Sequence, residues 1–199
     1  MGASAPARSA VVLAASTGGP RTLVAIAARL PNPFPAAVLI VQHMPRAFAA
    51  GLAERLTSVC SFPIGVAEDG EPILPSRGYL APGGQHLVVE GEGREGGRIA
   101  LLDTPSAVGV RPSADLAMAS ASEVYGARTI GVVLSGMGRD GADGVVAIKG
   151  RGGRVIVEAP DLAAIPWMPR AAISTGVVDA VLPVEAIPDA ITRMLGRQG

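Results

Sequence analysis

The chain has 199 residues, enough for one large domain or two small ones. Hydrophobic residues make up 49% of it but aromatic residues only 3%, so a core must be built mainly from aliphatic side chains. The 17 basic and 17 acidic residues balance, which argues against a general nucleic-acid binder because that class usually carries a basic excess.

Cysteine content and hydropathy bear on the compartment. Cys60 is the single cysteine, so no internal disulfide can form, as is usual in a reducing compartment; we interpret it as a small core residue. No apolar run is long enough to span a membrane, and residues 1–10 lack a signal-peptide hydrophobic region. We therefore expect a cytoplasmic protein without membrane insertion. Two histidines and one cysteine predict no metal site, and no cofactor is expected.

The first half of the chain alternates apolar runs with helical patterns. Strands are predicted at 10–14 and 36–41, and helices at 19–30 and 46–58. Continuous apolar runs are typical of strands buried on both faces, and strand–helix alternation predicts a parallel sheet. Polar residues then follow the strands: Ser16 after the first and His43 after the second. Right-handed crossovers bring such strand ends to the same edge of a sheet.

Three interpretations of Ser16 are open from its local sequence, A-S-T-G-G-P. Ser and Thr are favoured helix N-caps, and capping is the commonest role for a serine in this place. Glycine-rich turns at helix N-termini also bind phosphate, but no P-loop lysine and no G-x-G-x-x-G motif is present. The third interpretation is a nucleophile, which requires a base elsewhere in the chain.

The middle of the chain reads differently. Short strands are predicted at 64–67, 78–81, 85–90 and 98–102, separated by glycine-rich turns. This spacing favours an antiparallel insertion of hairpins near residues 64–102. The turn at 91–97 is expected to be mobile.

The strand–helix alternation resumes after Pro112. Ser113 is a candidate cap for a helix that runs to Tyr125. Further strands are predicted at 129–134, 154–157 and 177–182, and further helices from the 135–144 loop to 150, at 169–174 and at 187–195. We expect an α/β fold of three αβα layers around a mostly parallel, doubly wound sheet. Residues 10–197 would form a single domain, preceded by a flexible segment, residues 1–9.

Asp140 lies in the glycine-dense loop after the predicted strand at 129–134, so it joins Ser16 and His43 at one sheet edge. These three residue types are those of nucleophilic acyl transfer by a Ser–His–Asp triad. Each also has a structural interpretation: the histidine as a hydrogen-bonded support, and Asp140, like Asp143, as a helix cap. His86 lies in the predicted hairpins and is a poorer candidate for the base.

Six segments together resemble the catalytic domain of the CheB family of chemotaxis protein-glutamate methylesterases. They occur in the family order and extend over about residues 10 to 195. In this chain they read A-S-T-G-G-P at 15–20, V-Q-H-M-P at 41–45, L-A-P-G-G-Q-H-L at 80–87, R-P-S-A-D at 111–115, L-S-G-M-G-R-D-G-A-D-G at 134–144 and M-P-R-A-A-I at 168–173.

The resemblance implies a role for five residues. Ser16 would be the nucleophile, His43 the base and Asp140 the third member of the triad. Met137 would serve the oxyanion site through its N–H, and Thr17 would help to position the histidine. The implied reaction is hydrolysis of γ-glutamyl methyl esters on the cytoplasmic helices of methyl-accepting chemotaxis receptors, with deamidation of receptor glutamines as a second activity of some members.

Several points depart from the family pattern. Ala14 stands where glycine is common, and Trp167 precedes the M-P-R segment where glycine is usual. We interpret Trp167 as a core or hairpin residue, with a substrate-contacting rim aromatic as the alternative. Because no phospho-acceptor receiver domain precedes Ser16, we expect either a stand-alone esterase, which we favour, or the catalytic part of a trimmed or fused member. Two other functions stay open on the same fold, a catalytically silent receptor-binding module and a small-molecule esterase. A monomer is the default expectation.

Overall fold

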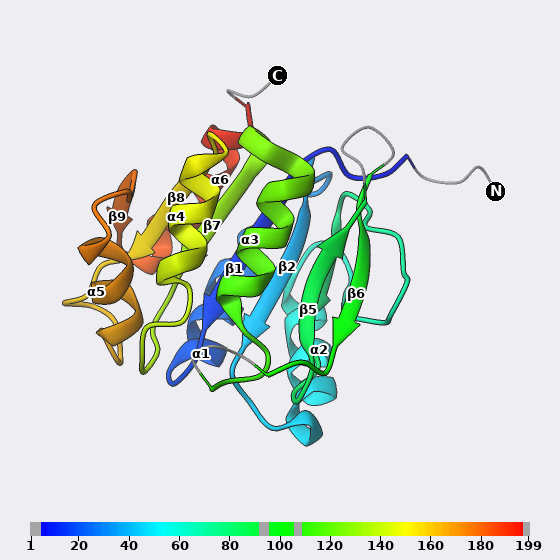
Figure 1. Cartoon of the computed structure of the whole chain (residues 1–199), viewed down its shortest axis with the longest axis horizontal. Helices are drawn as coiled ribbons and strands as arrows, with labels where there is room; N and C mark the ends of the chain where they lie inside the picture. Colours follow the sequence, from blue (N-terminus) through cyan, green and yellow to red (C-terminus); the bar gives the residue numbers. More distant parts are fainter. Residues whose placement is uncertain (1–4, 92–95, 106–108, 197–199) are drawn as a thin grey trace.

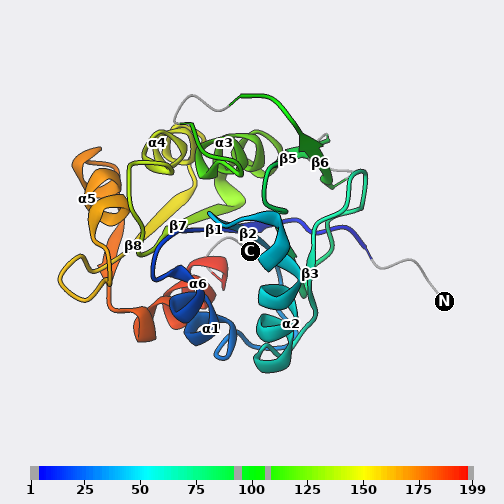
Figure 2. The ribbon, with the colours of Figure 1, turned by 90° about the horizontal axis from the view of Figure 1, so that it is seen from below.

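The computed structural model describes residues 5–91, 96–105 and 109–196. A parallel sheet lies between two helical layers, as the end-on view in Figure 2 shows. The helices α3 (Ala114–Tyr125), α4 (Ala142–Gly150) and α5 (Trp167–Ser174) cover one face, and α1 (Gly19–Ala27), α2 (Ala49–Val59) and α6 (Ile187–Gly196) cover the other (Figures 1 and 2). The predicted three-layer αβα fold is confirmed. Single 3₁₀ turns lie at Arg46–Phe48, Gly126–Arg128 and Val184–Ala186.

Seven parallel strands form the main sheet in the order β3-β4-β2-β1-β7-β8-β9. In chain order they are β1 (Ala10–Ala15), β2 (Ala37–Gln42), β3 (Ile64–Val66), β4 (Arg77–Leu80), β7 (Thr129–Val133), β8 (Arg154–Glu158) and β9 (Ala180–Leu182). Every residue of the central strands β1, β2 and β7 is buried. The continuous apolar runs in the sequence reflect this burial on both faces.

Alternate residues of β1 belong to the two cores. Val12 and Ala14 pack with residues of α3 and α4, whereas Val11 and Leu13 pack with residues of α1 and α6. Successive side chains of a strand point to opposite faces, so one short strand supports both helical layers. The sheet edge at its carboxyl end is thereby held rigidly from both sides.

The antiparallel part is smaller than predicted. It consists of β5 (His86–Glu90) paired with β6 (Arg98–Leu102), whereas β3 and β4 join the main sheet as parallel strands. Strands of three or four residues do not reveal their direction, which here is set by the pairing of β4 with β2 and of β3 with β4. The predicted mobile turn falls largely on residues 92–95, which lie outside the described residues.

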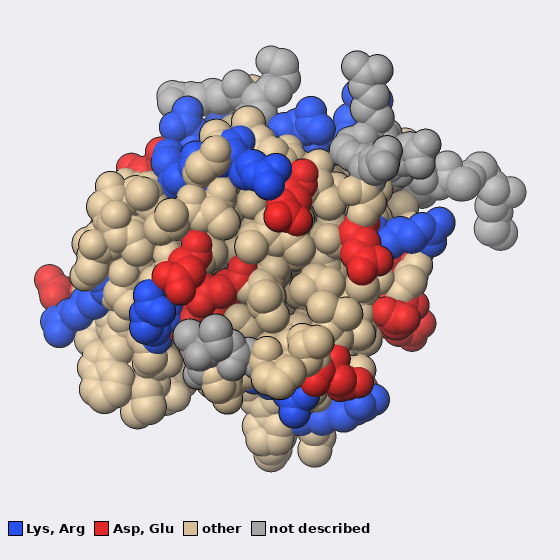
Figure 3. Space-filling model, in the orientation of Figure 1, with Lys and Arg blue, Asp and Glu red and all other residues tan. Residues whose placement is uncertain are grey.

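Some element ends also differ from prediction. The first helix ends at Ala27, the second is preceded by the 3₁₀ turn Arg46–Phe48, and α5 begins already at Trp167. Across the three described ranges, no helix combines the length and apolarity needed to cross a bilayer. On the face shown in Figure 3, acidic and basic side chains are interspersed.

Candidate active site

Ser16 follows β1 at the carboxyl edge of the sheet. Its N–H donates to the Ser135 carbonyl, and its own carbonyl accepts from the Gly19 N–H. The N-cap of α1 is Gly18, in the left-handed region at φ 86°, and no side chain caps that helix. The interpretation of Ser16 as the cap of this helix is therefore wrong. Within the described part of the chain, the Ser16 hydroxyl makes no hydrogen bond, so it is free to react.

His43 stands beside Ser16 because β1 and β2 run parallel in register. Ala15 is paired with Gln42, and the His43 N–H donates to the Ala15 carbonyl. The buried Gln42 amide reinforces this arrangement: its Nε2 donates to the Ser16 carbonyl at 2.9 Å and to the His43 carbonyl at 3.0 Å. One side chain thus joins the two loops that carry the candidate nucleophile and base.

Asp140 is bonded directly to His43. The His43 Nε2 lies 2.7 Å from the Asp140 Oδ2, and the carboxyl is 3% exposed. A carboxylate only accepts hydrogen bonds, so Nε2 carries the proton and Nδ1 is the unprotonated nitrogen of the neutral ring. The two residues are 97 positions apart in sequence. The fold therefore brings together two of the three predicted site residues as a hydrogen-bonded pair.

The Asp140 carboxylate also binds the N-terminus of α3. It accepts from the Ser113 hydroxyl at 2.9 Å and from the N–H groups of Ala114 and Asp115 at 2.6 and 3.0 Å. Burial alone would raise the pKa of Asp140, but the hydrogen bonds from His43, Ala114 and Asp115 outweigh it and hold that pKa below its ordinary value. The carboxylate stays ionised and fixed in orientation.

Ser16 and His43 are neighbours without a hydrogen bond between their side chains in the described structure. Such contacts are often loose in unliganded enzymes and tighten when substrate binds. The Thr17 side chain is exposed and likewise makes no hydrogen bond to His43 in this part of the chain; the Thr17 carbonyl instead accepts from the Ser135 hydroxyl at 2.8 Å.

Met137 lies on the loop that passes Ser16. A Cβ added to Gly136 would stand 2.8 Å from the Ser16 Cβ, so the backbone of this loop lies against the serine. The Met137 side chain is 55% exposed. Its N–H donates to no group among residues that the structure describes, so it is free to bind a ligand.

Buried polar groups fix the Ser135–Gly136 backbone. Glu158, 2% exposed, accepts from the Ser135 N–H at 2.7 Å, and the Ser135 hydroxyl accepts from the Ile165 N–H at 3.0 Å. Burial raises the pKa of Glu158, while its hydrogen bond to the Ser135 N–H opposes that effect. The loop that passes Ser16 is thereby fixed by hydrogen bonds to Glu158 and Ile165.

The other histidine is separate from this site. His86 is fully buried, its Nε2 donates to the Thr104 carbonyl at 2.9 Å, and burial lowers its pKa. Cys60 is half-buried against the core beside α1 and α2. In the described ranges, no group of three or more His, Cys, Asp or Glu side chains is placed to hold a metal ion.

The interpretation of Trp167 as a core residue is wrong. Its side chain is 53% exposed at the first position of α5. The neighbouring Pro166 bridges to Gly136, and the Met168 N–H donates to the Gly136 carbonyl, so Trp167 lies near the Met137 loop. The aromatic ring belongs to the surface around the site.

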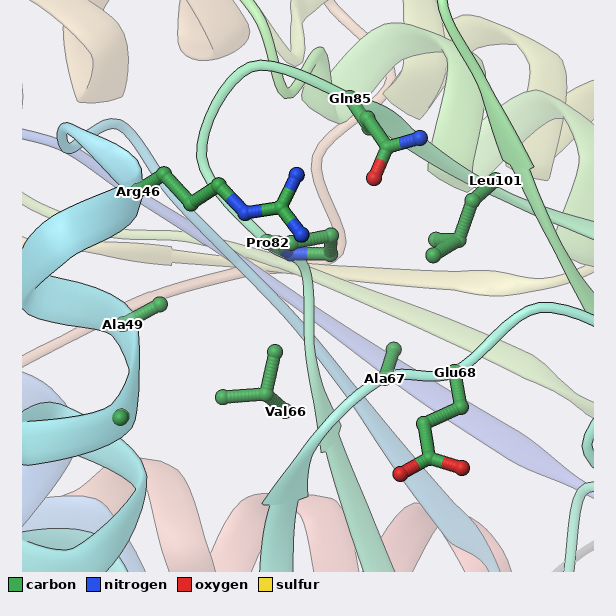
Figure 4. A pocket seen from close by; sticks show the side chains of 9 residues that line it. Arg46, Ala49, Val66, Ala67, Glu68, Pro82, Gln85 and Leu101 are labelled. Atoms are coloured by element: carbon green, nitrogen blue, oxygen red, sulfur yellow. The ribbon is translucent and has the colours of Figure 1, made fainter.

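A hollow of about 380 Å³ lies on the other side of His43, beyond the start of α2. Figure 4 shows the Arg46 guanidinium and the Gln85 amide reaching into it, with Val66 and Leu101 on its walls. Arg46 has no acidic partner among the residues described. The carboxyl edge of the sheet is thus hollowed on the β4 side of His43.

Four polar residues of the site have no role predicted from the sequence: Gln42, Asp115, Ser135 and Glu158. Gln42, Ser135 and Asp115 fall inside the segments that resembled the family, which was the available signal. Their contacts cross between elements far apart in sequence. Neither periodicity nor spacing could reveal those contacts.

Comparisons with known proteins identify the family of the chain. The CheB methylesterase family model matches residues 11–191. The protein-glutamate methylesterase/protein-glutamine glutaminase of Pyrococcus abyssi is 46% identical over 192 residues, which are 96% of this chain and 51% of that protein. The Symbiobacterium thermophilum protein of the same name is 42% identical over 95% of this chain and 51% of its own length.

A solved structure supports the same assignment. The crystal structure of the Thermotoga maritima CheB methylesterase catalytic domain superposes with a TM-score of 0.90 at 39% identity, covering 94% of this chain and 98% of that one. The chain spans about half the length of the curated relatives that it matches. It belongs to the CheB methylesterase family.

Proposed function

We propose that the chain is the catalytic domain of a protein-glutamate methylesterase that uses Ser16, His43 and Asp140. One observation carries the proposal: a buried carboxylate holds His43 at 2.7 Å beside a serine whose hydroxyl is uncommitted. The relatives' name, protein-glutamate methylesterase/protein-glutamine glutaminase, supports this reaction class.

The first half of the reaction transfers the acyl group to the enzyme. Ser16 Oγ attacks the γ-carbonyl carbon of a glutamyl methyl ester while His43 Nδ1 takes the hydroxyl proton. The charge that forms on the imidazole is stabilised by Asp140, whose carboxylate cannot turn away because α3 holds it. His43 then gives the proton to the methoxy oxygen, the C–O bond breaks and methanol leaves.

The second half reverses these roles with water. His43 Nδ1 removes a proton from water, which attacks the acyl-serine carbonyl, and Ser16 leaves as the alcohol. The glutamate carboxylate is released. In both halves a negative charge forms on the carbonyl oxygen, and the free Met137 N–H is proposed to bind it together with neighbouring N–H groups.

The same steps would hydrolyse a glutamine side chain, with ammonia as the leaving group in place of methanol. Protonation by His43 is needed more in this case because an amide nitrogen is a poorer leaving group than an alkoxide oxygen. A second activity as protein-glutamine glutaminase is proposed on this basis and on the relatives' name.

The proposed substrates are the cytoplasmic helices of methyl-accepting chemotaxis receptors, which implies a cytoplasmic enzyme. An ester on a helix surface must reach Ser16 without the helix entering a deep pocket. The sheet edge meets that requirement, with Met137 and Trp167 exposed on one side and the Arg46 hollow on the other. Each turnover would leave a new negative charge on the receptor helix and shift its packing.

The decisive experiment measures methanol release from methylated chemoreceptor membranes with the wild type and with Ser16→Ala. Release by the wild type and none by the variant is the expected result. Equal release by both would contradict the proposal. Wild-type hydrolysis of a free glutamate γ-methyl ester without any release from receptors would favour a small-molecule esterase, and no hydrolysis of either would favour a binding module.

A further inference from the structure

Asp140 and Asp115 each cap the N-terminus of the helix at which the other aspartate lies. Asp140, just before α4, accepts from the Ala114 and Asp115 N–H groups at the start of α3. Asp115, in the first turn of α3, accepts on its Oδ1 from the Gly141 and Gly144 N–H groups at the start of α4, at 2.8 and 2.7 Å. The two helix N-termini are therefore joined by reciprocal carboxylate caps.

The first turn of α4 has no capping side chain of its own and needs an acceptor from another element. Its N-cap is Gly141, which has no side chain, so the free N–H groups of its first turn depend on a partner from elsewhere. The helices are also tightly packed here: a Cβ on Gly144 would stand 2.7 Å from the Met118 Cβ and 3.1 Å from the Asp115 Cα. Asp115 lies on α3, and its two hydrogen bonds hold the start of α4, with the adjoining Asp140 loop, against α3.

The two carboxyl groups differ in how many donors serve them. Asp140 accepts from His43, the Ser113 hydroxyl and two N–H groups, whereas Asp115 accepts from two N–H groups. Burial and the neighbouring Asp140 raise the pKa of Asp115 to about 6, while the pKa of Asp140 is lowered. When the pair binds a proton, Asp115 takes it and Asp140 keeps its charge toward His43.

Other charged groups face this pair. Arg139, exposed on the same loop, is bonded to Asp143 in the first turn of α4 and lies within electrostatic reach of Asp115. His43 meets Asp140 from the β2 side, and His86 lies within its electrostatic reach from β5, near Arg111. Asp143, in the first turn of α4, carries the same charge as Asp115 but is exposed, and in the described ranges no hydrogen bond joins it to Asp140.

We propose that Asp115 is a positioning residue of the esterase, which acts through Asp140: its bonds to the start of α4 fix the Asp140 carboxylate against His43, and its charge adds to that of Asp140. The proposal rests on the function proposed above. It explains why a carboxylate, and not a neutral cap, stands at this place: a second negative charge favours the imidazolium that forms during catalysis.

The test compares Asp115→Asn, Asp115→Ala and the matched control Asp143→Asn in steady-state hydrolysis of a γ-glutamyl methyl ester. The Asp115→Asn side chain retains an oxygen that can accept from Gly141 and Gly144 but carries no charge. We expect the kcat of this variant to fall roughly three- to tenfold with KM unchanged, and the acid limb of its kcat/KM profile to move down by about 0.5–1 pH unit.

Asp115→Ala removes the cap as well as the charge. Because displacement of a catalytic group by about 1 Å can cost about 100-fold, we expect kcat to fall by about 10- to 100-fold. Asp143→Asn should keep the wild-type kcat and pH profile. Wild-type kinetics in both Asp115 variants, or an equal change in Asp143→Asn, would overturn the proposal.

A measurement without turnover separates this proposal from the proposed function. The chain has two histidines, and His86 is buried, so the His43 ring can be followed by NMR through a pH titration in a Ser16→Ala background. Adding Asp115→Asn should lower the midpoint of the His43 titration. An unchanged midpoint would overturn the coupling even if the wild type is an active esterase, whereas a lowered midpoint would support it even if no ester is hydrolysed.

Discussion

The loops β1–α1 and β7–α4 have similar backbones, but the first leaves its key side chain, Ser16, unbonded and the second binds its key side chain, Asp140, tightly. Each follows a fully buried strand, and each helix begins after a glycine in the left-handed region, Gly18 at φ 86° and Gly141 at φ 99°. Neither glycine supplies a side-chain cap. Yet the Ser16 hydroxyl makes no hydrogen bond in the described structure, whereas the Asp140 carboxylate accepts four.

The difference follows from the chemistry of the two groups. A buried carboxylate is costly unless several donors surround it, so Asp140 can remain charged only where His43 and the α3 N-terminus meet it. A hydroxyl is neutral and needs no such compensation. The loop of the reacting group can therefore leave it free, while the loop of the supporting group must immobilise it.

Asp140→Asn would break this comparison most strongly. The substituted side chain keeps an oxygen for the Ser113 hydroxyl and the Asp115 N–H. It loses the charge, and an amide nitrogen in place of Oδ2 no longer accepts from Ala114 and presents an N–H to His43, which favours the wrong tautomer. In Ser–His–Asp enzymes this change costs about 10⁴-fold, so we expect kcat/KM to fall roughly 10³- to 10⁴-fold.

The same variant made in a Ser16→Ala background tests whether the residues act as a unit. Because effects within a catalytic unit are not additive, the double variant should be no slower than Ser16→Ala alone. A loss of less than tenfold in the single variant Asp140→Asn, or full additivity in the double variant, would show that Asp140 acts independently of Ser16.

Alanine at the two left-handed glycines tests the design that the loops share. At either position the left-handed backbone costs an alanine about 1–2 kcal/mol of unfolding free energy. At Gly18 the new Cβ would also stand 2.6 Å from the Ser135 Oγ and 2.8 Å from the Ala164 Cβ, whereas at Gly141 the nearest atom is 3.5 Å away. Overpacking adds about 1–3 kcal/mol, so Gly18→Ala should lose about 2–5 kcal/mol of unfolding free energy and Gly141→Ala about 1–2.

Urea unfolding of both glycine variants measures this difference directly. Equal losses at the two positions would mean that the close packing of Gly18 against Ser135 and Ala164 relaxes without cost. The Ser16 loop would then be more adaptable than its contacts suggest.

Long apolar runs and local capping were readable from the sequence. The strands β1, β2 and β7 were predicted within one or two residues because burial on both faces leaves an uninterrupted apolar signature. Ser113 was predicted as a cap, and its hydroxyl does accept from the Leu116 N–H, at 3.5 Å. Parallel connectivity then placed Ser16, His43 and Asp140 at one edge.

Contacts between distant polar groups were not readable. The Gln42 amide bonds two backbone carbonyls, and the caps of Asp115 and Asp140 cross between α3 and α4, so no local pattern encodes them. The direction of β3 and β4 was also hidden, because three or four apolar residues pair equally well either way. Trp167 was assigned to the core on residue type, although its position at the start of α5 exposes it.

The smallest expected effect concerns the pH dependence of the unfolding free energy, to which Asp115 and Asp140 contribute with opposite sign. The pKa of Asp115 is about 6 in the folded chain, above an ordinary value of about 3.9, so the folded state binds more protons between these pH values. Its contribution to stability is therefore fully present below about pH 4 and is lost as pH rises through 6. Asp140, with its lowered pKa, acts in the opposite sense: its contribution is present above about pH 4 and is lost at more acid pH.

Asp115→Asn should reduce the fall in unfolding free energy between pH 4.5 and 7 by about 1 kcal/mol relative to the wild type, because solvent screens this partly exposed carboxyl. Ser16→Ala should keep the wild-type fall, because the first turn of α1 carries no acidic residue. Urea unfolding at the two pH values gives both comparisons. If the unfolding free energies of Asp115→Asn and the wild type change equally with pH, Asp115 is not the member of the carboxyl pair that binds the proton. The contrast between the free Ser16 loop and the fixed Asp140 loop would then rest on hydrogen bonds alone.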